Sequence, residues 1–256
     1  MRQYNTLTLT IENGVAALTF NRPHQLNAMN NRMMREIIEA LEQIRATPSV
    51  KVGLIQGTGR AFMAGADIKE YAVRSEAEFN AFQQQGTKLY ALIETASIPF
   101  IAAVNGFALG GGLEIALACD FILAAESAKL GLPEVHLGLI PGGGGVQRLL
   151  SRTGLNRLKE IVLLGRSYSA QQFLDWGIVN AVAQDDAFET LVQEWVQKLR
   201  RRPSQSVAAL KELLCPSSTE LPFAIRIERE KATLKELFPT LIAKELIQAF
   251  ISKEDK

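Results

Sequence analysis

The strongest constraint on the fold is an alternation of short apolar runs with amphipathic segments along the first 185 residues. Residues 6–20 alternate polar and apolar positions on either side of Asn13 and Gly14, a pair that favours tight hairpin turns because both residues tolerate positive φ. The apolar residues within 33–44 then recur at helical spacing, and residues 50–57 have the composition of a short buried strand. The chain is therefore expected to open with a hairpin, a helix and a strand.

The alternation of helices and strands continues beyond these elements. Ser75 and Glu78 match the capping box that starts a helix, and we expect that helix to run to about Thr95. The segments expected after it are a strand over residues 100–106, a helix over 112–119, a strand over 120–126, a helix over 145–152 and a strand over 178–183. Alternating strands and helices predict an α/β core.

The C-terminal part of the sequence has a different character. Beyond Ala187 only helical periodicity remains, interrupted at Pro203 and at the pair Cys215 and Pro216. We therefore predict an α/β core over residues 1–200 and a helical cluster over residues 201–256.

Composition limits the chemistry that is available to this chain. Its formal charge of +1 provides no field to capture nucleic acid or an anionic membrane surface. The two cysteines lie in no metal-ligand spacing, and two histidines give poor support for a zinc site. We expect no metal, no nucleic-acid partner and no membrane partner, and the lack of a secretory signal pattern predicts a cytoplasmic protein. Carboxylates are left to transfer protons.

A glycine-rich stretch supplies the first candidate for catalysis. Residues 106–120 place three consecutive glycines after a predicted strand and before a predicted helix. Glycines let a ligand approach the backbone closely, and the first N–H groups of a helix have no partner within it. Glu114 is the one charge inside the apolar run that follows, and a buried carboxylate requires a partner or a function. The competing explanation is an acid that merely stabilises the first turn of a helix.

A second acid precedes another glycine cluster twenty residues later. Glu134 follows a proline, and four glycines at 142–145 open a predicted helix. A phosphate-binding loop is the alternative, but such a loop has Lys and then Ser or Thr after its final glycine, where this chain has Val146 and Gln147. We therefore predict that Glu114 and Glu134 form the acid/base centre of an enzyme.

A third segment, AFMAGADIKEY at residues 61–71, breaks a predicted strand with a turn of small residues. Alone, it has the pattern of an ordinary loop with Gly65 at positive φ. Together the three segments resemble the crotonase superfamily, the enoyl-coenzyme A hydratases and isomerases, which share AGAD, GGG-x-E and PE-x-x-LG-x-x-P-G-x-GG elements in this order. The resemblance runs from the hairpin through FNRPHQLNAMN at residues 20–30 to about Ala183.

The resemblance implies a ββα superhelix core followed by a C-terminal helical cluster, and it assigns roles within the site. The backbone N–H groups of Ala66 and Gly111 would bind the thioester oxygen as an oxyanion hole. Glu114 would orient and deprotonate water at Cβ, and Glu134 would give or take the proton at Cα. The residues that would contact the substrate or its coenzyme A portion are Ala64, Asp67, Ile68, Lys69, Gly110, Pro133, Leu137 and Gly142.

The presence of two glutamates favours hydration of a trans-2-enoyl-CoA to a 3-hydroxyacyl-CoA, because the related isomerases generally use one acid in this region. Coenzyme A would be part of the substrate, and no separate cofactor is expected. The alternatives are isomerisation or decarboxylation of an acyl-CoA, and a non-catalytic subunit that binds coenzyme A. Since two carboxylates near one water cannot both ionise cheaply, we expect one raised pKa, with Glu114 at its helix end the more acidic.

The resemblance also implies self-association. Family members commonly form trimers or dimers of trimers around their helical tails, and the same is expected of this chain. The amphipathic pattern of the tail would pack on a neighbouring subunit or cover the acyl site. The tail departs from the family in lacking the acid-glycine break usual between the last helices.

Overall fold

The computed structural model describes residues 3–254. The chain divides into two compact units. The first unit comprises the residues up to Glu94 together with Pro99–Arg200, and the second comprises Thr95–Ile98 together with the residues from Arg201 onward. Within the described residues, every strand belongs to the first unit.

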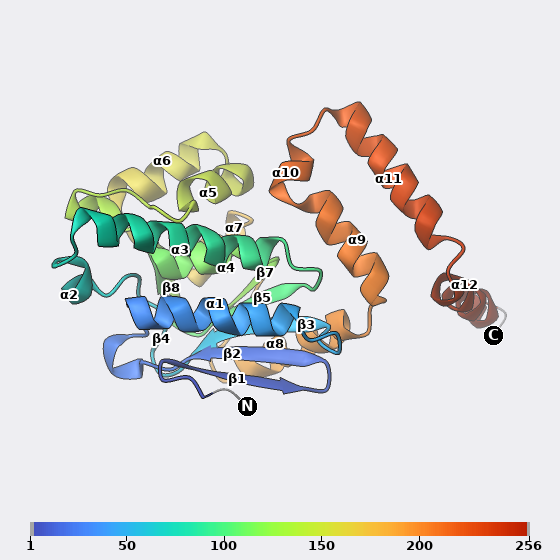
Figure 1. The fold of residues 1–256 in the computed structure, drawn as a ribbon, viewed down its shortest axis with the longest axis horizontal. Coiled ribbons are helices and arrows are strands. Elements are labelled where there is room, and N and C mark those ends of the chain that lie inside the picture. Colours follow the sequence, from blue (N-terminus) through green and yellow to red (C-terminus); the bar gives the residue numbers. More distant parts are fainter. Residues whose placement is uncertain (1–2, 255–256) are drawn as a thin grey trace. The chain divides into compact units, whose positions relative to one another are not determined.

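The first unit contains two sheets (Figure 1). The larger has the order β1-β2-β3-β5-β7-β10; β1 pairs antiparallel with β2, and the other neighbours pair parallel. Its strands are β1 (Leu7–Glu12), β2 (Val15–Phe20), β3 (Val52–Gly57), β5 (Phe100–Val104), β7 (Phe121–Ala125) and β10 (Ala181–Ala183). The smaller sheet has the order β4-β6-β8-β9, and its strands are β4 (Ala61–Met63), β6 (Phe107–Leu109), β8 (Lys129–Gly131) and β9 (Ser167–Ser169).

Helices follow the strands throughout the first unit and make up the second. In the first unit they are α1 (Asn31–Arg45), α2 (Ile68–Tyr71), α3 (Glu76–Glu94), α4 (Gly111–Ala118), α5 (Gly145–Thr153), α6 (Leu155–Leu164), α7 (Ala170–Asp175) and α8 (Phe188–Arg200), with the 3-10 helices η1 (Pro23–Gln25) and η2 (Glu134–Leu137). The second unit has α9 (Ser204–Leu214), α10 (Pro216–Thr219), α11 (Phe223–Leu237) and α12 (Leu241–Glu254). Over residues 3–254, no helix combines the length and apolar character needed to cross a membrane.

The chain visits both sheets in a repeating order. β3 and β4 precede α2 and α3, β5 and β6 precede α4, and β7 and β8 precede α5 and α6. Each repeat adds one strand to each sheet before a helix, which confirms the predicted α/β class with a ββα core. Because β4, β6 and β8 pair parallel, their carboxyl ends lie at one edge of the smaller sheet, where ligands commonly bind in parallel sheets.

Local signals in the sequence set several element boundaries. Asn13 and Gly14 have φ of 50° and 79°, so both central residues of the hairpin turn adopt the positive φ that was predicted. The Ser75 N–H donates to Glu78 Oε2 at 2.8 Å, and the Glu78 N–H donates to Ser75 Oγ at 3.3 Å, which confirms the capping box of α3.

The strand predicted over residues 178–183 is wrong in its first half. Only Ala181–Ala183 pair, with β7. The N–H groups of Ile178 and Val179 both donate to the Phe173 carbonyl, at 2.9 and 3.1 Å, and therefore close the turn after α7 instead of joining the sheet.

The core of the first unit lies on both faces of the larger sheet. α8 covers one face, where Phe188, Val192 and Val196 pack against Val52, Leu54, Ile101, Ala103, Leu123 and Ala125. α1 and α3 run side by side (Figure 1), and the predicted apolar stripe of α1 is buried. The rings of Phe20 and Phe62, 5.3 Å apart, join the larger sheet to the smaller.

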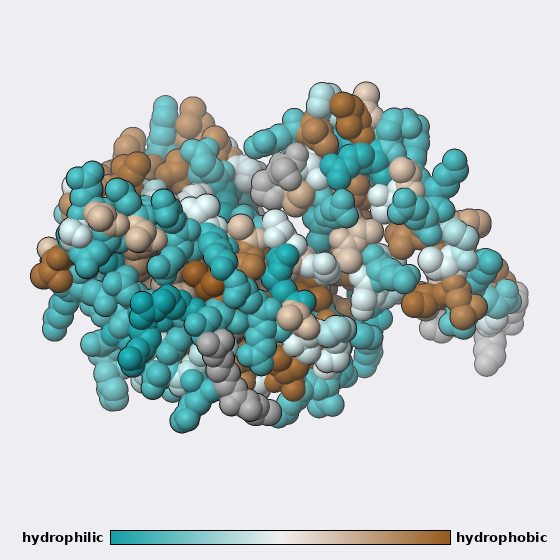
Figure 2. Space-filling model, in the orientation of Figure 1, coloured by the Kyte–Doolittle hydropathy of each residue, from teal (hydrophilic) through white to brown (hydrophobic). Residues whose placement is uncertain are grey.

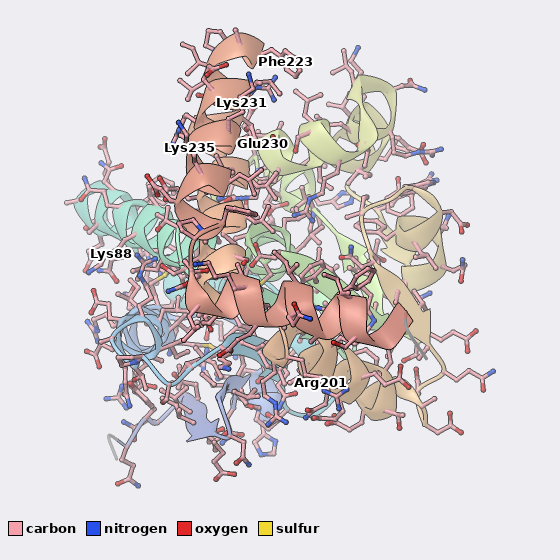
Figure 3. The ribbon with its side chains drawn as sticks, turned by 90° about the vertical axis from the view of Figure 1, so that its right-hand side faces the viewer. Lys88, Arg201, Phe223, Glu230, Lys231 and Lys235 are labelled. Carbon is pink, nitrogen blue, oxygen red and sulfur yellow. The ribbon has the colours of Figure 1, made fainter. Side chains whose placement is uncertain are left out.

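The second unit leaves many apolar side chains exposed. Along α11, Phe223 lies near one end and the charged Glu230, Lys231 and Lys235 follow (Figure 3). The exposed large apolar residues of this unit include Leu210, Leu214, Phe223, Ile225, Leu234, Phe238, Leu241, Leu246 and Phe250.

Candidate active site

A cavity of about 310 Å³ opens in the first unit and is lined by the turns that follow β4, β6 and β8. The residues predicted from the sequence that line it are Ala64, Ala66, Ile68, Gly110, Gly111, Glu114, Pro133, Glu134, Leu137 and Gly142. The structure thus brings both glutamates and both proposed oxyanion-hole residues to one cavity. Asp67 and Lys69 are not among its lining residues.

The turn after β4 orients the Ala66 N–H. Ala66 pairs with Met29 in an isolated parallel bridge. In that bridge the Met29 N–H donates to the Gly65 carbonyl at 2.8 Å, and the Asp67 N–H donates to the Met29 carbonyl at 2.9 Å. Because backbone groups alternate in direction along an extended segment, the Ala66 N–H points away from Met29 and is available to a ligand. Gly65 has φ of +100°, as predicted.

The segment before α1 supports this turn. The buried Asn27 side chain donates to the carbonyls of Thr58 and Ala61 at 3.0 and 2.7 Å. Arg22 donates its backbone N–H to Asn27 Oδ1 at 2.8 Å, and its guanidinium pairs with Asp67 at 3.0 Å. Asp67 therefore anchors the turn to this segment, whereas Lys69 is exposed on α2.

The turn after β6 presents the Gly111 N–H. Gly111 is the first residue of α4, so its N–H has no acceptor within the helix. Gly110 has φ +51° and ψ −125°, a conformation that residues with a Cβ rarely adopt. A Cβ on Gly112 would lie 2.0 Å from the Met63 carbonyl oxygen, so the glycines also allow α4 to pack directly on β4.

Glu114, on the first turn of α4, is 3% exposed, and its carboxylate is held by two backbone amides. Oε1 accepts from the N–H groups of Gly143 and Gly145 at 2.7 and 2.9 Å, in the glycine-rich turn that opens α5. The Tyr90 hydroxyl donates to Oε2 at 3.4 Å. Burial raises the pKa of Glu114 above its ordinary value, and the two amide donors oppose that rise.

Glu134, the first residue of η2, has fewer hydrogen-bond donors around its carboxyl group than Glu114 has. Its Oε2 is buried and has no hydrogen-bond partner within residues 3–254. Its Oε1 faces the turn after β6, since a Cβ on Gly110 would lie 2.9 Å from that atom. Burial, and then the charge of Glu114, raise the pKa of Glu134 to about 7. The prediction of a single raised pKa is therefore wrong in part, because burial raises the pKa of both carboxyl groups, that of Glu134 to about 7.

Two side chains near Glu114 were not predicted from the sequence. Tyr90 lies on α3 with its ring buried, and the guanidinium of Arg148 lies over that ring at 5.1 Å. Arg148 forms a bidentate pair with Glu94, at 2.7 and 2.9 Å, and also donates to the Gly143 carbonyl. This arrangement fixes the turn whose amides hold Glu114. Tyr90 fits the pattern of an ordinary buried helix position and Arg148 that of an ordinary surface position. Their spacing in the sequence therefore does not mark either of them as part of a site.

The rest of the cavity wall is largely apolar. Its apolar and aromatic residues include Met29, Met34, Ile68, Tyr71, Phe79, Phe82, Leu137, Leu139 and Ile140. No group of three or more His, Cys, Asp or Glu side chains within residues 3–254 is arranged to hold a metal ion. The arrangement is that of a site with two carboxyl groups and two backbone donors beside an apolar chamber.

Comparisons with known proteins agree with this geometry. A family model described as enoyl-CoA hydratase/isomerase matches residues 10–256. The chain is 38% identical over 252 residues to a probable enoyl-CoA hydratase of Bacillus subtilis, covering 97% of this chain and 96% of that protein. It is 35% identical over 247 residues to the 2,3-dehydroadipyl-CoA hydratase of Escherichia coli, covering 96% of each. A crystal structure of enoyl-CoA hydratase from Bacillus anthracis matches with a TM-score of 0.93 at 33% identity, covering 97% of each chain.

Proposed function

The chain belongs to the enoyl-CoA hydratase/isomerase family, and we propose that it is an enoyl-CoA hydratase, a hydro-lyase that adds water to a trans-2-enoyl-CoA to give a 3-hydroxyacyl-CoA. One observation carries the proposal: Glu114 and Glu134 line a single cavity together with Ala66 and Gly111. Two carboxyl groups can activate a water and protonate a carbon in the same turnover.

The thioester carbonyl would lie between the N–H groups of Ala66 and Gly111. Addition of water at C3 of the enoyl group moves electron density through C2 onto the thioester oxygen. Two backbone donors aimed at that oxygen stabilise the enolate-like transition state, typically by a few kcal/mol for each donor. The orientation of the Ala66 N–H and the position of Gly111 at the start of α4 support this role.

Glu114 is proposed as the base that activates water. The two amides on Oε1 favour the ionised carboxylate, and Oε2 retains lone pairs that can accept a proton from water. As the water oxygen bonds to C3, one of its protons passes to Glu114.

Glu134 is proposed as the acid that protonates C2. With a pKa of about 7, its carboxyl group carries a proton in a large fraction of molecules near neutral pH. That proton passes to C2 as the electrons of the double bond form the new C–H bond. At the end Glu114 holds one extra proton and Glu134 lacks one, so a proton returns between them, through water in the cavity, before the next turnover.

The test is a substrate panel with purified protein. We expect crotonyl-CoA to lose its enone absorbance as water adds, and 3-enoyl and malonyl-type thioesters to react far more slowly. Replacing either carboxyl group, Glu114→Gln or Glu134→Gln, should lower kcat by orders of magnitude with a modest change in KM. Glu126→Gln, at an exposed carboxylate, is the matched control. Rapid turnover of 3-enoyl-CoA or malonyl-type thioesters without hydration would refute the proposal in favour of isomerisation or decarboxylation.

We also propose that the substrate brings its own coenzyme A, with no resident cofactor, and that the protein works in the cytoplasm. Lys69, exposed on α2 beside the cavity residue Ile68, is the cation we propose to meet a phosphate of the coenzyme. Lys69→Ala should raise KM for crotonyl-CoA without lowering kcat, and an unchanged KM would remove Lys69 from this role.

We further propose a homotrimer or a dimer of trimers. In the first unit, exposed apolar side chains gather over α5 and α6 (Figure 2), and they include Leu150, Leu155, Leu163 and Leu164. In the second unit, α11 and α12 expose several more. Large exposed apolar areas mark association surfaces. Light scattering should give the mass of three or six chains, and a monomeric mass would disprove the proposal.

A further inference from the structure

Gly86 is a glycine inside a long helix. It lies within α3, which spans Glu76–Glu94, far from either end. Glycine is the least favourable helix residue after proline because it loses the most backbone freedom on folding. A glycine at such a position therefore calls for a local reason.

Neither packing nor backbone conformation supplies that reason. A Cβ on Gly86 would meet Tyr90 Cε2 at 3.6 Å and Met34 Cε at 3.7 Å, which are ordinary van der Waals distances. The residue has no positive φ. By contrast, a Cβ on Gly143 would lie 2.4 Å from the Tyr90 hydroxyl, so that glycine is required by its neighbours.

What Gly86 does provide is space in the cavity. It lines the same cavity as Glu114 and Glu134, and Met34 and Tyr90 are the side chains nearest to the position of its missing Cβ. A larger residue would place its side chain against these two cavity residues and narrow the chamber. Phe82, one turn earlier on α3, adds a further apolar surface to the same wall.

The chamber next to Gly86 suits an uncharged group. None of the cavity-lining residues in the described part of the chain is Lys or Arg, whereas Glu114 and Glu134 both line it. Arg74 lies with its guanidinium 3.7 Å from the centre of the Phe82 ring and does not line the cavity. Its Nη2 pairs with Glu70 at 3.1 Å, and its Nε and Nη1 are buried with no hydrogen-bond partner within residues 3–254. Because the Phe82 ring covers Arg74 and no cation lines the chamber, a substrate carboxylate here would lie near two acids without a charged partner in the cavity wall, which is unfavourable.

We propose that Gly86 is a specificity-determining residue: its missing side chain keeps open the channel between Met34 and Tyr90 through which an uncharged acyl tail, longer than that of crotonyl-CoA, extends from the reacting carbons. The proposal rests on the proposed hydratase function, because it assumes that an acyl-CoA occupies the cavity. It makes unbranched 2-enoyl thioesters of about eight carbons good substrates, and thioesters with a terminal carboxylate poor ones.

The experiment compares Gly86→Ala and Gly86→Leu with the parent on crotonyl-CoA and trans-2-octenoyl-CoA. Gly86→Leu should lower kcat/KM for the octenoyl substrate by roughly tenfold or more relative to crotonyl-CoA, since pocket methylenes discriminate on that scale. Gly86→Ala should give a smaller loss together with a higher Tm, because alanine favours the helix. The controls are Gln84→Ala and Gln84→Leu, at an exposed position of the same helix that does not line the cavity.

Binding measurements separate this proposal from the proposed reaction. Calorimetric titration with octanoyl-CoA and butyryl-CoA requires no turnover, and Gly86→Leu should weaken octanoyl-CoA binding selectively. If the parent protein does not hydrate enoyl thioesters but Gly86→Leu still weakens octanoyl-CoA binding selectively, the hydratase function is refuted and the channel is supported. The proposal would be overturned if Gly86→Leu lost affinity equally for short and long acyl chains, or lost none for the long chain. It would also be overturned if the parent protein were as active on 2,3-dehydroadipyl-CoA as on octenoyl-CoA. Gly86→Ala keeps the test decisive if the leucine variant fails to fold.

Discussion

The raised pKa of Glu134 predicts that this residue destabilises the folded protein at neutral and alkaline pH. The carboxyl group titrates at about 7 in the folded protein, against an ordinary value of 4.5. Below pH 4.5 it is protonated in both states, so its contribution to stability is fully present. As the pH rises towards 7 the unfolded chain releases this proton before the folded chain does, so stability falls and the contribution is lost above about pH 7.

The size of the effect follows from the shift. The difference between 7 and 4.5 is about 2.5 units, and at about 1.36 kcal/mol per unit the upper limit is about 3.4 kcal/mol. Glu134 is only partly buried, so solvent screening reduces this to about 1–2 kcal/mol. Glu134→Gln has no charge to desolvate and should therefore be more stable than the parent at pH 8, with a Tm higher by about 3–6 °C for a chain of this size.

Thermal unfolding at pH 5 and pH 8 tests this reasoning. The stability difference between Glu134→Gln and the parent should be small at pH 5 and reach its full value at pH 8. The exposed Glu126→Gln variant should show no such pH-dependent gain. A Glu134→Gln variant that is no more stable than the parent at pH 8 would refute the view that Glu134 is strained by burial beside Glu114.

Three further predictions concern catalysis. In crotonyl-CoA assays across pH, kcat/KM should fall above about pH 7, because Glu134 then lacks the proton that C2 must receive, and a rate that keeps rising to pH 9 would exclude Glu134 as the acid. Gly143→Ala would place a methyl carbon 2.5 Å from Glu114 Oε2, so steady-state assays should show kcat lowered by about a hundredfold or more, and near-normal kcat would contradict the observed packing. Arg148→Lys cannot keep the bidentate pair with Glu94, so kcat should fall by about tenfold at similar KM and the pH profile should shift. A lower Tm without those kinetic changes would make Arg148 purely structural.

The catalytic candidates could be predicted from the sequence because each stands out from the residues around it. Glu114 was recognisable because it is a charge in an apolar run beside three glycines, and the structure shows it buried and held by two amides. Glu134 was recognisable through its position before a second glycine cluster. Five strands of the larger sheet have five or six residues, long enough for their alternation or apolar composition to be informative, whereas β10 has three and was predicted too long.

The smaller sheet, Tyr90 and Arg148 could not be predicted, because their local sequence is ordinary and their importance depends on where the fold places them. The strands of the smaller sheet have three residues each, too few for periodicity to distinguish them from turns, although their carboxyl ends place the three motifs together. Tyr90 and Arg148 lie on helices with ordinary amphipathic patterns. Such a pattern predicts which face is buried, but not whether that face meets another element or a cavity.

The division of roles between the two glutamates depends on their hydrogen-bond partners rather than on their residue type. The sequence predicts Glu114 to be the more acidic from its place at a helix end, but it does not show which groups donate to either carboxyl group. In the structure, Glu114 Oε1 accepts from two backbone amides, whereas Glu134 Oε2 is buried with no partner among residues 3–254. Donors to a carboxylate stabilise its ionised form, and their absence in a buried site favours the protonated form. The four glycines before α5 thus matter to the chemistry, because the amides of Gly143 and Gly145 make Glu114 the better base while Glu134 keeps its proton to give.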